Sequence, residues 1–345
     1  MISIDAMGGD HGPAVTVAGV ARAIKALSGE PVRFLLHGDA AALEAVLARS
    51  PDVAAVSEIR AASGVIGSDA KPAHAMRRGK GTSMWNAIES VRGGEARAAV
   101  SAGNTGALMA ISRLLLRMTG DMDRPALVAN WPTLRGTSSV LDVGANVVCD
   151  ADRLMEFAIM GVAYHRAVHK TSRPTVGLLN VGTETEKGHD DVRGADRLLR
   201  QFDLGFDYHG FVEGDDIAKG TVDVVVTDGF TGNVALKTAE GLARFFSAQL
   251  RTTFTGSLQA KLGALIARPA LRKMAERLDT GSVNGGPFLG LNGIVVKSHG
   301  GADARGFSNA IVLAGRLARS DVAAEIERDL QRKPSAPTAL EPVSP

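Results

Sequence analysis

Short apolar runs alternate with longer stretches of helical periodicity along this chain of 345 residues. Runs of branched apolar residues that end in turn residues predict strands, and apolar residues repeated every three or four positions predict helices. The predicted strands are 2–5, 32–37, 98–101, 126–131, 138–143, 175–181, 222–227 and 294–297. The clearest predicted helices are 14–27, 40–49, 107–118, 152–168 and 234–250. This alternation is typical of an α/β protein with a mostly parallel central sheet.

The domain prediction follows from where the chain lacks linkers. No Pro/Gly/Ser-rich segment interrupts residues 1–330, which we predict to form one α/β unit of two intertwined halves. Residues 331–345 contain four prolines and few apolar side chains, so this tail is predicted to be disordered.

Charge and cysteine content exclude several classes of protein. The 39 basic and 37 acidic residues nearly balance, which argues against a nucleic-acid partner. The single cysteine, Cys149, excludes an internal disulfide, and no apolar run approaches the roughly 20 residues of a spanning helix. The amino terminus lacks the features of a signal peptide, so we expect a cytoplasmic protein. No His, Cys, Asp or Glu cluster has metal-ligand spacing, and we predict neither a metal nor a cofactor.

Glycine-rich corners recur where predicted strands end. Two of them, SAGNTGALMA at 101–110 and VVTDGFTGNVALK at 225–237, share the pattern Ser/Thr-x-Gly-x-Thr-Gly. The other corners are DAMGGDHGP at 5–13, LDVGAN at 141–146, NVGTETEKG at 180–188 and NGGPFLGLNG at 284–293. Loops at the carboxyl ends of strands line the crevice of an open α/β sheet, and glycine lets the backbone approach a ligand closely. A helix that starts after such a turn favours an anion, so phosphate is the expected ligand.

Each corner also has a purely structural explanation, because glycine is common at tight turns between a strand and a helix. The chain contains no G-x-x-x-x-G-K-[ST] motif, and its first corner reads G-G-x-x-G in place of the dinucleotide fingerprint. Neither ATP nor NAD is therefore favoured.

Six segments of the chain resemble segments of the PlsX family. In chain order over about residues 1–320, they are DAMGGDHGP, SAGNTGALMA, LDVGAN, LLNVGTETEKG, VVTDGFTGNVALKTAEG and GLNGIVVKSHGGAD. Members of this family are bacterial phosphate acyltransferases of phospholipid synthesis. The resemblance implies reversible transfer of a long-chain acyl group from acyl carrier protein (ACP) to inorganic phosphate, giving acyl phosphate and free ACP. The product would supply an acyl-phosphate-dependent glycerol-phosphate acyltransferase.

The resemblance also implies a fold and an assembly. We expect a three-layer α/β/α sandwich with a mostly parallel central sheet, similar to phosphate acetyltransferases and isocitrate/isopropylmalate dehydrogenases. We further expect a homodimer that associates peripherally with an anionic membrane surface.

Three side chains are candidates for catalysis. Lys187 offers a cation for phosphate or for the oxyanion of the tetrahedral intermediate, and the alternative is a solvated lysine beside two glutamates. Asn104 and Asn233 offer amide donors beside their glycines, although both could simply cap helices. The predicted phosphate and substrate contacts are Gly8, Gly9, Asp10, Gly103, Thr105, Gly106, Gly229, Thr231 and Gly232. A histidine near a corner, His11, His189 or His299, could protonate the departing sulfur.

An amphipathic helical segment is predicted at 252–279. Its apolar positions include Leu258, Leu262, Leu265 and Ile266, and its basic positions include Arg268, Arg272 and Lys273. This combination suits an anionic lipid surface. Burial in the core or in a dimer contact is an equal alternative on the pattern alone, and the basic side chains would also suit acidic ACP.

Two other functions fit the same residues. One is a short-chain phosphate acyltransferase that uses acyl-CoA, and the other is a noncatalytic sensor of a phosphate ligand. Comparison of CoA and ACP substrates separates the first from the long-chain reaction, and absence of phosphorolysis would identify the second.

Overall fold

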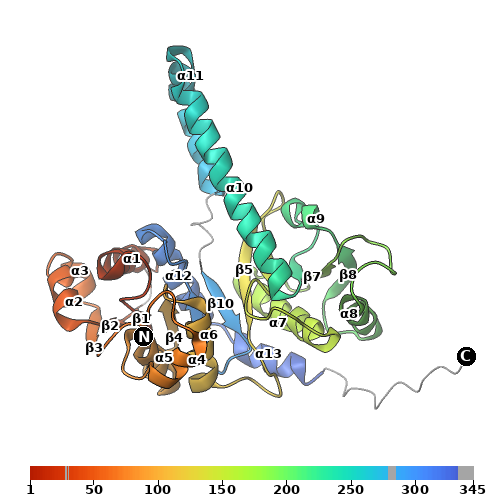
Figure 1. The fold of residues 1–345 in the computed structure, drawn as a ribbon, viewed down its shortest axis with the longest axis horizontal. Coiled ribbons are helices and arrows are strands. Elements are labelled where there is room, and N and C mark those ends of the chain that lie inside the picture. The colour runs from red at the N-terminus through yellow and green to blue at the C-terminus, as the bar shows by residue number, and fades with distance from the viewer. Residues whose placement is uncertain (28, 30, 279–284, 333–345) are drawn as a thin grey trace, which may run out of the picture.

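The computed structural model describes residues 1–27, 29, 31–278 and 285–332, and within them eleven strands form one sheet. Figure 1 shows this sheet running through two neighbouring lobes, with a pair of long helices standing out from the body. The part of the predicted disordered tail beyond residue 332 lies outside the described residues.

The first half of the sheet consists of five parallel strands. In spatial order they are β3 (Ser57–Ala61), β2 (Phe34–Gly38), β1 (Ile2–Asp5), β4 (Ala98–Ser101) and β11 (Ile294–Lys297). β11 lies near the end of the described chain but pairs with β4, with Lys297 opposite Ser101. The carboxyl ends of β1, β4 and β11 therefore meet at one edge of the sheet.

The second half of the sheet runs in the opposite direction. Its parallel strands are β6 (Thr137–Leu141), β9 (Val224–Val226), β7 (Thr175–Leu179) and β8 (Asp207–Val212). β10 (Gly286–Leu289) and β5 (Ala126–Pro132) connect the halves through three antiparallel pairings, β11 with β10, β10 with β5 and β5 with β6. An odd number of antiparallel steps reverses the strand direction between the two halves.

Helices cover both faces of the sheet. Those outside the projecting pair are α1 (Gly12–Ala26), α2 (Ala40–Leu47), α3 (Pro51–Ala54), α4 (Pro72–Arg78), α5 (Ser83–Arg92), α6 (Thr105–Leu116), α7 (Ala151–His169), α8 (Asp190–Gln201), α9 (Gly214–Lys219), α12 (Ala304–Leu317) and α13 (Val322–Leu330). Successive strand residues point to opposite faces, and Ala98 and Val100 accordingly join the core beneath α1, α7 and α12. Ala99 joins the core beneath α5 and α6. Two cores separated by one sheet make the three layers that the sequence predicts.

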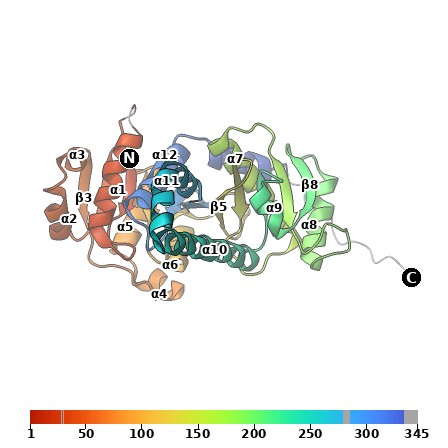
Figure 2. The same ribbon diagram turned by 90° about the horizontal axis from the view of Figure 1, so that it is seen from above.

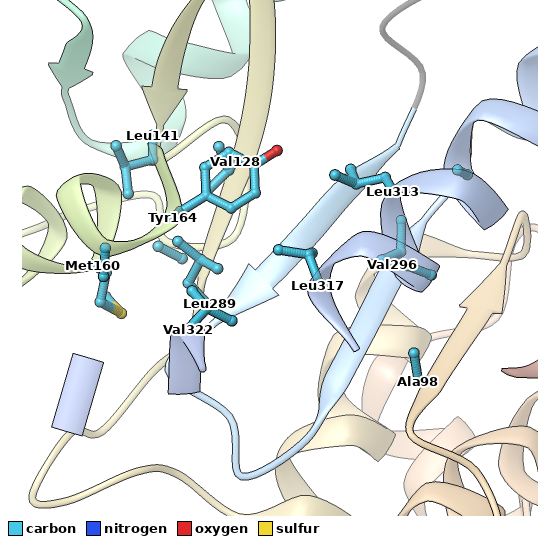
Figure 3. Packing of buried hydrophobic residues seen from close by; sticks show 14 of the residues in the cluster. Ala98, Val128, Leu141, Met160, Tyr164, Leu289, Val296, Leu313, Leu317 and Val322 are labelled. Carbon is cyan, nitrogen blue, oxygen red and sulfur yellow. The ribbon is translucent and has the colours of Figure 1, made fainter. Parts of the chain in front are cut away.

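The carboxyl-terminal strands and helices bind the two halves together. Figure 3 shows Leu289 of β10 between Met160 and Tyr164 of α7 on one side and Leu317 of α12 on the other. All four side chains are buried and belong to one hydrophobic cluster. Because this cluster spans both lobes, burial of apolar surface couples them into one packed unit.

The predicted fold class is confirmed, with local differences in the strands. β1, β4 and β11 have the predicted bounds, whereas β3, β8 and β10 were not predicted. β3 has a polar edge-strand sequence, and β8 contains Gly210, at which its pairing with β7 shifts register. Glycine and polar residues weaken the period-two apolar signal, so these strands depend on their neighbours for their structure.

The projecting pair consists of α10 (Gly229–Thr255) and α11 (Leu258–Leu278). α10 starts five residues before the predicted helix, because Asp228 caps it by accepting a hydrogen bond from the Thr231 N–H (2.9 Å). The predicted segment 252–279 thus includes the end of α10 as well as α11. Figure 2 shows α10 leaving the second lobe and crossing toward the first.

Candidate functional site

A cleft of about 670 Å³ opens at the edge of the sheet where β1, β4 and β11 end. Six predicted site residues line it: Gly9, Asp10, Gly103, Asn104, Thr105 and Gly106. Lys297, the last residue of β11, and Gly300 after it contribute another wall, and Met7, Val65 and Ile66 add apolar surface. Two of the glycine corners, at 5–13 and 101–110, and the Gly300 turn after β11 therefore share one cleft.

Asp5 organises the backbone of this corner. Its carboxylate accepts hydrogen bonds from the N–H groups of Met7 (3.3 Å) and Gly8 (3.2 Å) and from the Ser101 hydroxyl (2.6 Å). Ser101 Oγ in turn accepts from the Gly103 N–H (3.0 Å). Burial raises the pKa of Asp5, and the bond from Ser101 opposes that rise. The acid therefore holds the β1 and β4 turns together.

Glycine is required at the first corner by packing and by backbone conformation. A Cβ on Gly8 would lie 2.5 Å from a carboxylate oxygen of Asp5 and 2.8 Å from the backbone nitrogen of Gly103. Gly9 adopts a φ of +91°, a backbone conformation that residues with a side chain rarely adopt. The N–H of the next residue, Asp10, donates to the Gly300 carbonyl (2.9 Å). The three turns consequently approach one another more closely than side chains would permit.

The start of α6 faces the same cleft. Asn104 caps this helix, because its Oδ1 accepts from the Ala107 N–H (2.8 Å) while its Nδ2 donates to the Ser68 carbonyl (2.6 Å). The N–H groups of Thr105 and Gly106 have no acceptor within the helix and are suited to an anion. The capping role proposed as the alternative for Asn104 is thus present in the structure, at a residue that also lines the cleft.

Lys297 is the site residue that the sequence reasoning missed. Its Nζ donates to the carbonyls of Ala102 (3.4 Å) and Ser298. Burial, and secondarily the nearby Lys237 of α10, lowers the pKa of Lys297 to about 8. The available signal was its place as the last residue of a predicted strand, directly before the Gly300 turn.

Two of the three candidate histidines adjoin residues that line the cleft, because His299 directly precedes Gly300 and His11 directly follows Asp10. The Nδ1 of His299 accepts from the Gly301 N–H (3.1 Å), and burial followed by the charge on Lys237 lowers the pKa of His299. His11 and His189 precede α1 and α8 as cap residues without side-chain cap hydrogen bonds. His189 lies in the other half of the molecule and is not adjacent to this cleft.

A second corner, in the other half, repeats the design of the first. Asp142 follows β6 and accepts from the N–H groups of Gly144 (3.1 Å), Ala145 (3.0 Å) and Asn146 (2.6 Å). Burial raises the pKa of Asp142, and the hydrogen bonds from Ala145 and Asn146 oppose that rise. A buried acid thus gathers the turn after a strand at both corners.

The predicted glycines of α10 belong to this second corner. The Gly229 N–H donates to the Asn146 carbonyl (2.7 Å), and a Cβ on Gly232 would collide with the Asp142 carbonyl oxygen. Thr231 is exposed, and its hydroxyl donates to Asp228 (2.8 Å). The exposed Asn233 lies beside Gly144.

Lys187 is exposed on the loop between β7 and α8. Its backbone carbonyl accepts from the Asn180 amide (3.1 Å), which ties the loop to the end of β7. The residues that line the first cleft do not include Lys187, Asn233, Gly229, Thr231 or Gly232. The structure therefore divides the predicted site between the first corner, the second corner and the Lys187 loop, and Lys237 of α10 lies near Lys297 of the first.

The described residues form neither a metal cluster nor a membrane-spanning helix. Among the described residues, no three His, Cys, Asp or Glu side chains lie close enough to hold a metal ion. In the same part of the chain no helix combines the length and apolar character needed to cross a bilayer.

Comparison with known proteins identifies the family. A family model described as fatty acid synthesis protein matches residues 1–325. The chain is 66% identical over 340 residues to the phosphate acyltransferase of Caulobacter vibrioides, covering 99% of this chain and 94% of that protein. It is 59% identical over 345 residues to the phosphate acyltransferase of Phenylobacterium zucineum, covering 100% and 97%.

Solved structures show the same fold at low sequence identity. A phosphotransacetylase from Streptococcus pyogenes superposes with a TM-score of 0.61 at 15% identity, covering 92% of this chain and 93% of that one. The predicted similarity to phosphate acetyltransferases is thus confirmed for the fold. Together with the family model and the identity to full-length relatives, the motifs show that the chain belongs to the fatty acid synthesis protein family, the PlsX family.

Proposed function

We propose that this protein transfers a long-chain acyl group from acyl-ACP to inorganic phosphate and that the first cleft binds the phosphate. The supporting observation is the convergence of three glycine turns and the start of α6 on one cleft. Backbone N–H groups at such a site favour a small anion. Relatives named phosphate acyltransferase support the reaction class.

The chemistry requires an oriented nucleophile more than a strong base. A phosphate oxygen bonds to the thioester carbonyl carbon, and the carbonyl electrons move onto oxygen. When the carbonyl re-forms, the C–S bond breaks and its electron pair leaves on sulfur, which then takes a proton from water. A free thiol has a pKa of about 8.5, so the thiolate is a good leaving group. Fixed donors for phosphate and for the oxyanion would therefore supply most of the catalysis.

The predicted catalytic side chains have separate positions in this scheme. Asn104 lines the phosphate cleft, and its capping bond holds the start of α6 in place. Lys187 and Asn233 belong to the second half, and we assign them to the acyl thioester or its oxyanion. Met7, Val65 and Ile66 give the first cleft an apolar side for the acyl group next to the thioester.

The deciding experiment is a mass-spectrometric assay for acyl phosphate formed from palmitoyl-ACP and phosphate. The proposal predicts acyl phosphate and free ACP in equal amounts. Acetyl-CoA in place of palmitoyl-ACP is the matched comparison, and faster turnover of acetyl-CoA would favour the short-chain alternative. Phosphate binding without any acyl phosphate would instead identify a sensor.

We also propose that the projecting helical pair contacts an anionic membrane. Leu262 and Ile266 of α11 are 61% and 77% exposed, and Phe245 and Phe246 of α10 are exposed as well. Residues 241–275 contain six basic residues and no acidic one. Exposed apolar side chains with an excess of positive charge suit an anionic lipid surface. Delivery of acyl phosphate there would place the product beside a membrane-bound glycerol-phosphate acyltransferase.

Sedimentation with phosphatidylglycerol vesicles tests this contact. Leu262→Glu with Ile266→Glu should abolish co-sedimentation, because two carboxylates would have to enter the lipid interface. Leu134→Glu changes a leucine that is 89% exposed on the body and should leave co-sedimentation intact. If the double variant still co-sediments with vesicles, Arg268 and Arg272 would instead be assigned to ACP binding, which a pull-down with ACP would detect.

The exposed apolar side chains beside the second corner favour a homodimer. Phe230 and Val234 on the first turns of α10 and Val147 and Val148 next to Asn146 are all exposed. Burial of such a patch against a second copy would stabilise an interface. Light scattering should give twice the chain mass, and Phe230→Glu with Val148→Glu should give monomers. A wild-type monomer at micromolar concentration would refute the proposal.

A further inference from the structure

Lys297 is placed at the first cleft by the pairing of β11 with β4. Val295 and Val296 fill the cores on opposite faces of the sheet, so the last residue of the strand emerges at its edge beside Ser101. The Lys297 side chain lines the same cleft as Thr105 and Gly106, whose N–H groups begin α6. Lys297 at the end of β11 and the start of α6 after β4 thus face the same cleft.

The ammonium group of Lys297 is held by neutral acceptors. Its two hydrogen bonds go to the carbonyls of Ala102 and Ser298, and an ammonium group has three donors. Within the described part of the chain, Lys297 makes no ion pair with a carboxylate. By contrast, the nearby Lys237 is paired with Glu240 (2.9 Å). Lys297 therefore retains a donor at the cleft that no carboxylate takes up in a direct ion pair.

The surroundings of Lys297 contain charges of both signs. Asp10 and Asp5 favour its charged form, whereas burial and Lys237 disfavour it. An anion in the cleft would replace the solvation that the ammonium group has lost and would make the charge more favourable. A dianion such as phosphate is therefore a better partner for this lysine than a neutral ligand.

We propose that Lys297 binds the phosphate nucleophile directly and, with the first N–H groups of α6, fixes its position in the cleft. This inference rests on the proposed acyl transfer to phosphate and names a residue for the phosphate half of that site. Lys297 does not exchange a proton in the reaction. Its contribution is to hold the dianion where one oxygen can reach the thioester carbon.

Steady-state kinetics with inorganic phosphate and palmitoyl-ACP test the assignment. Lys297→Met should raise the phosphate KM at least about tenfold, because a charge-assisted hydrogen bond to the dianion is lost. The KM for palmitoyl-ACP should change less than about threefold, since the variant leaves the acyl side of the cleft unaltered. Lys297→Arg restores the charge and should recover part of the phosphate affinity. A merely structural lysine would not produce this separation of the two KM values.

Lys297→Gln guards against misfolding of the methionine variant, because its amide can still donate to the two carbonyls. Lys219→Met, a remote lysine paired with Asp215, is the charge control and should leave both KM values unchanged. Isothermal titration with inorganic phosphate measures binding without turnover. A phosphate Kd and KM within about twofold of wild type in folded Lys297→Met and Lys297→Gln would overturn the inference.

The same measurements separate this inference from the proposed function. If wild type binds phosphate through Lys297 but forms no acyl phosphate, only the acyl-transfer proposal fails. If wild type forms acyl phosphate and the Lys297 variants bind phosphate normally, only the assignment of Lys297 fails.

Discussion

Replacing Lys297 with methionine should change how the stability of the protein depends on pH. Burial, and secondarily Lys237, lowers the pKa of this lysine from 10.5 to about 8, while Asp10 and Asp5 act in the opposite direction. Methionine is similar in length and fills the same space without a charge. The hydrogen bonds that it cannot make to backbone carbonyls should cost about the same at every pH, so the pH dependence isolates the charge.

The sign and size follow from the two pKa values. The folded protein loses the Lys297 proton near pH 8, whereas the unfolded chain retains it until about pH 10.5. Because the unfolded chain binds more protons between these values, the wild-type free energy of unfolding gains a contribution that rises with pH across this window. Each pKa unit corresponds to about 1.4 kcal/mol, so the contribution between pH 7 and pH 10 is about 2 kcal/mol.

Urea denaturation at about pH 7 and about pH 10, followed by circular dichroism, measures the effect. The stability of Lys297→Met relative to wild type should fall by about 2 kcal/mol between the two conditions. Titration of other groups cancels in this comparison because both proteins share them. Lys219→Met, at an exposed and salt-bridged lysine, should show the same difference from wild type at both pH values. A pH-independent difference for Lys297→Met would refute the reasoning, since it would mean that the ammonium group is not buried.

Further substitutions at four positions test the predicted site residues and the first corner. Gly8→Ala should cost about 2 kcal/mol and most activity, because its Cβ would lie 2.5 Å from a buried carboxylate oxygen. Gly214→Ala, which meets no atom within 4 Å, is its control, and equal urea midpoints for both variants would contradict the packing argument. Asn104→Ala should lose about 1 kcal/mol with its cap and raise the phosphate KM, whereas Asn104→Asp should keep the cap yet weaken phosphate binding by charge repulsion. If Asn104→Asp matched wild type in phosphate KM, the start of α6 would not bind the anion. Lys187→Ala and Asn233→Ala should lower kcat with unchanged melting temperature, because both side chains are exposed; full activity would remove them from the mechanism.

Local chemistry in the sequence predicts much of the fold. ISID at 2–5 alternates isoleucine with polar residues before a glycine turn, and the structure forms β1 over the same residues. Asn104 and Asp228 are helix-capping residue types placed before helical periodicity, and both cap helices. Periodicity, turn residues and caps act over a few residues, which is why they can be predicted without knowledge of the rest of the chain.

The arrangement of the site depended on contacts between distant segments. The glycine-rich segments were evident from the sequence. Their separation into groups in two halves of the molecule follows from the three antiparallel pairings, which reverse the second half of the sheet. Lys297 looked like the end of an ordinary strand until β11 paired with β4, nearly 200 residues earlier, and placed it in the cleft. The sequence alone determined the class of fold and the glycine-rich turns at the ends of its strands, because both arise from local propensity. Only the tertiary structure decided which turns share a cleft and which lysine is half-buried there, because strand pairing and desolvation act between residues far apart in the chain.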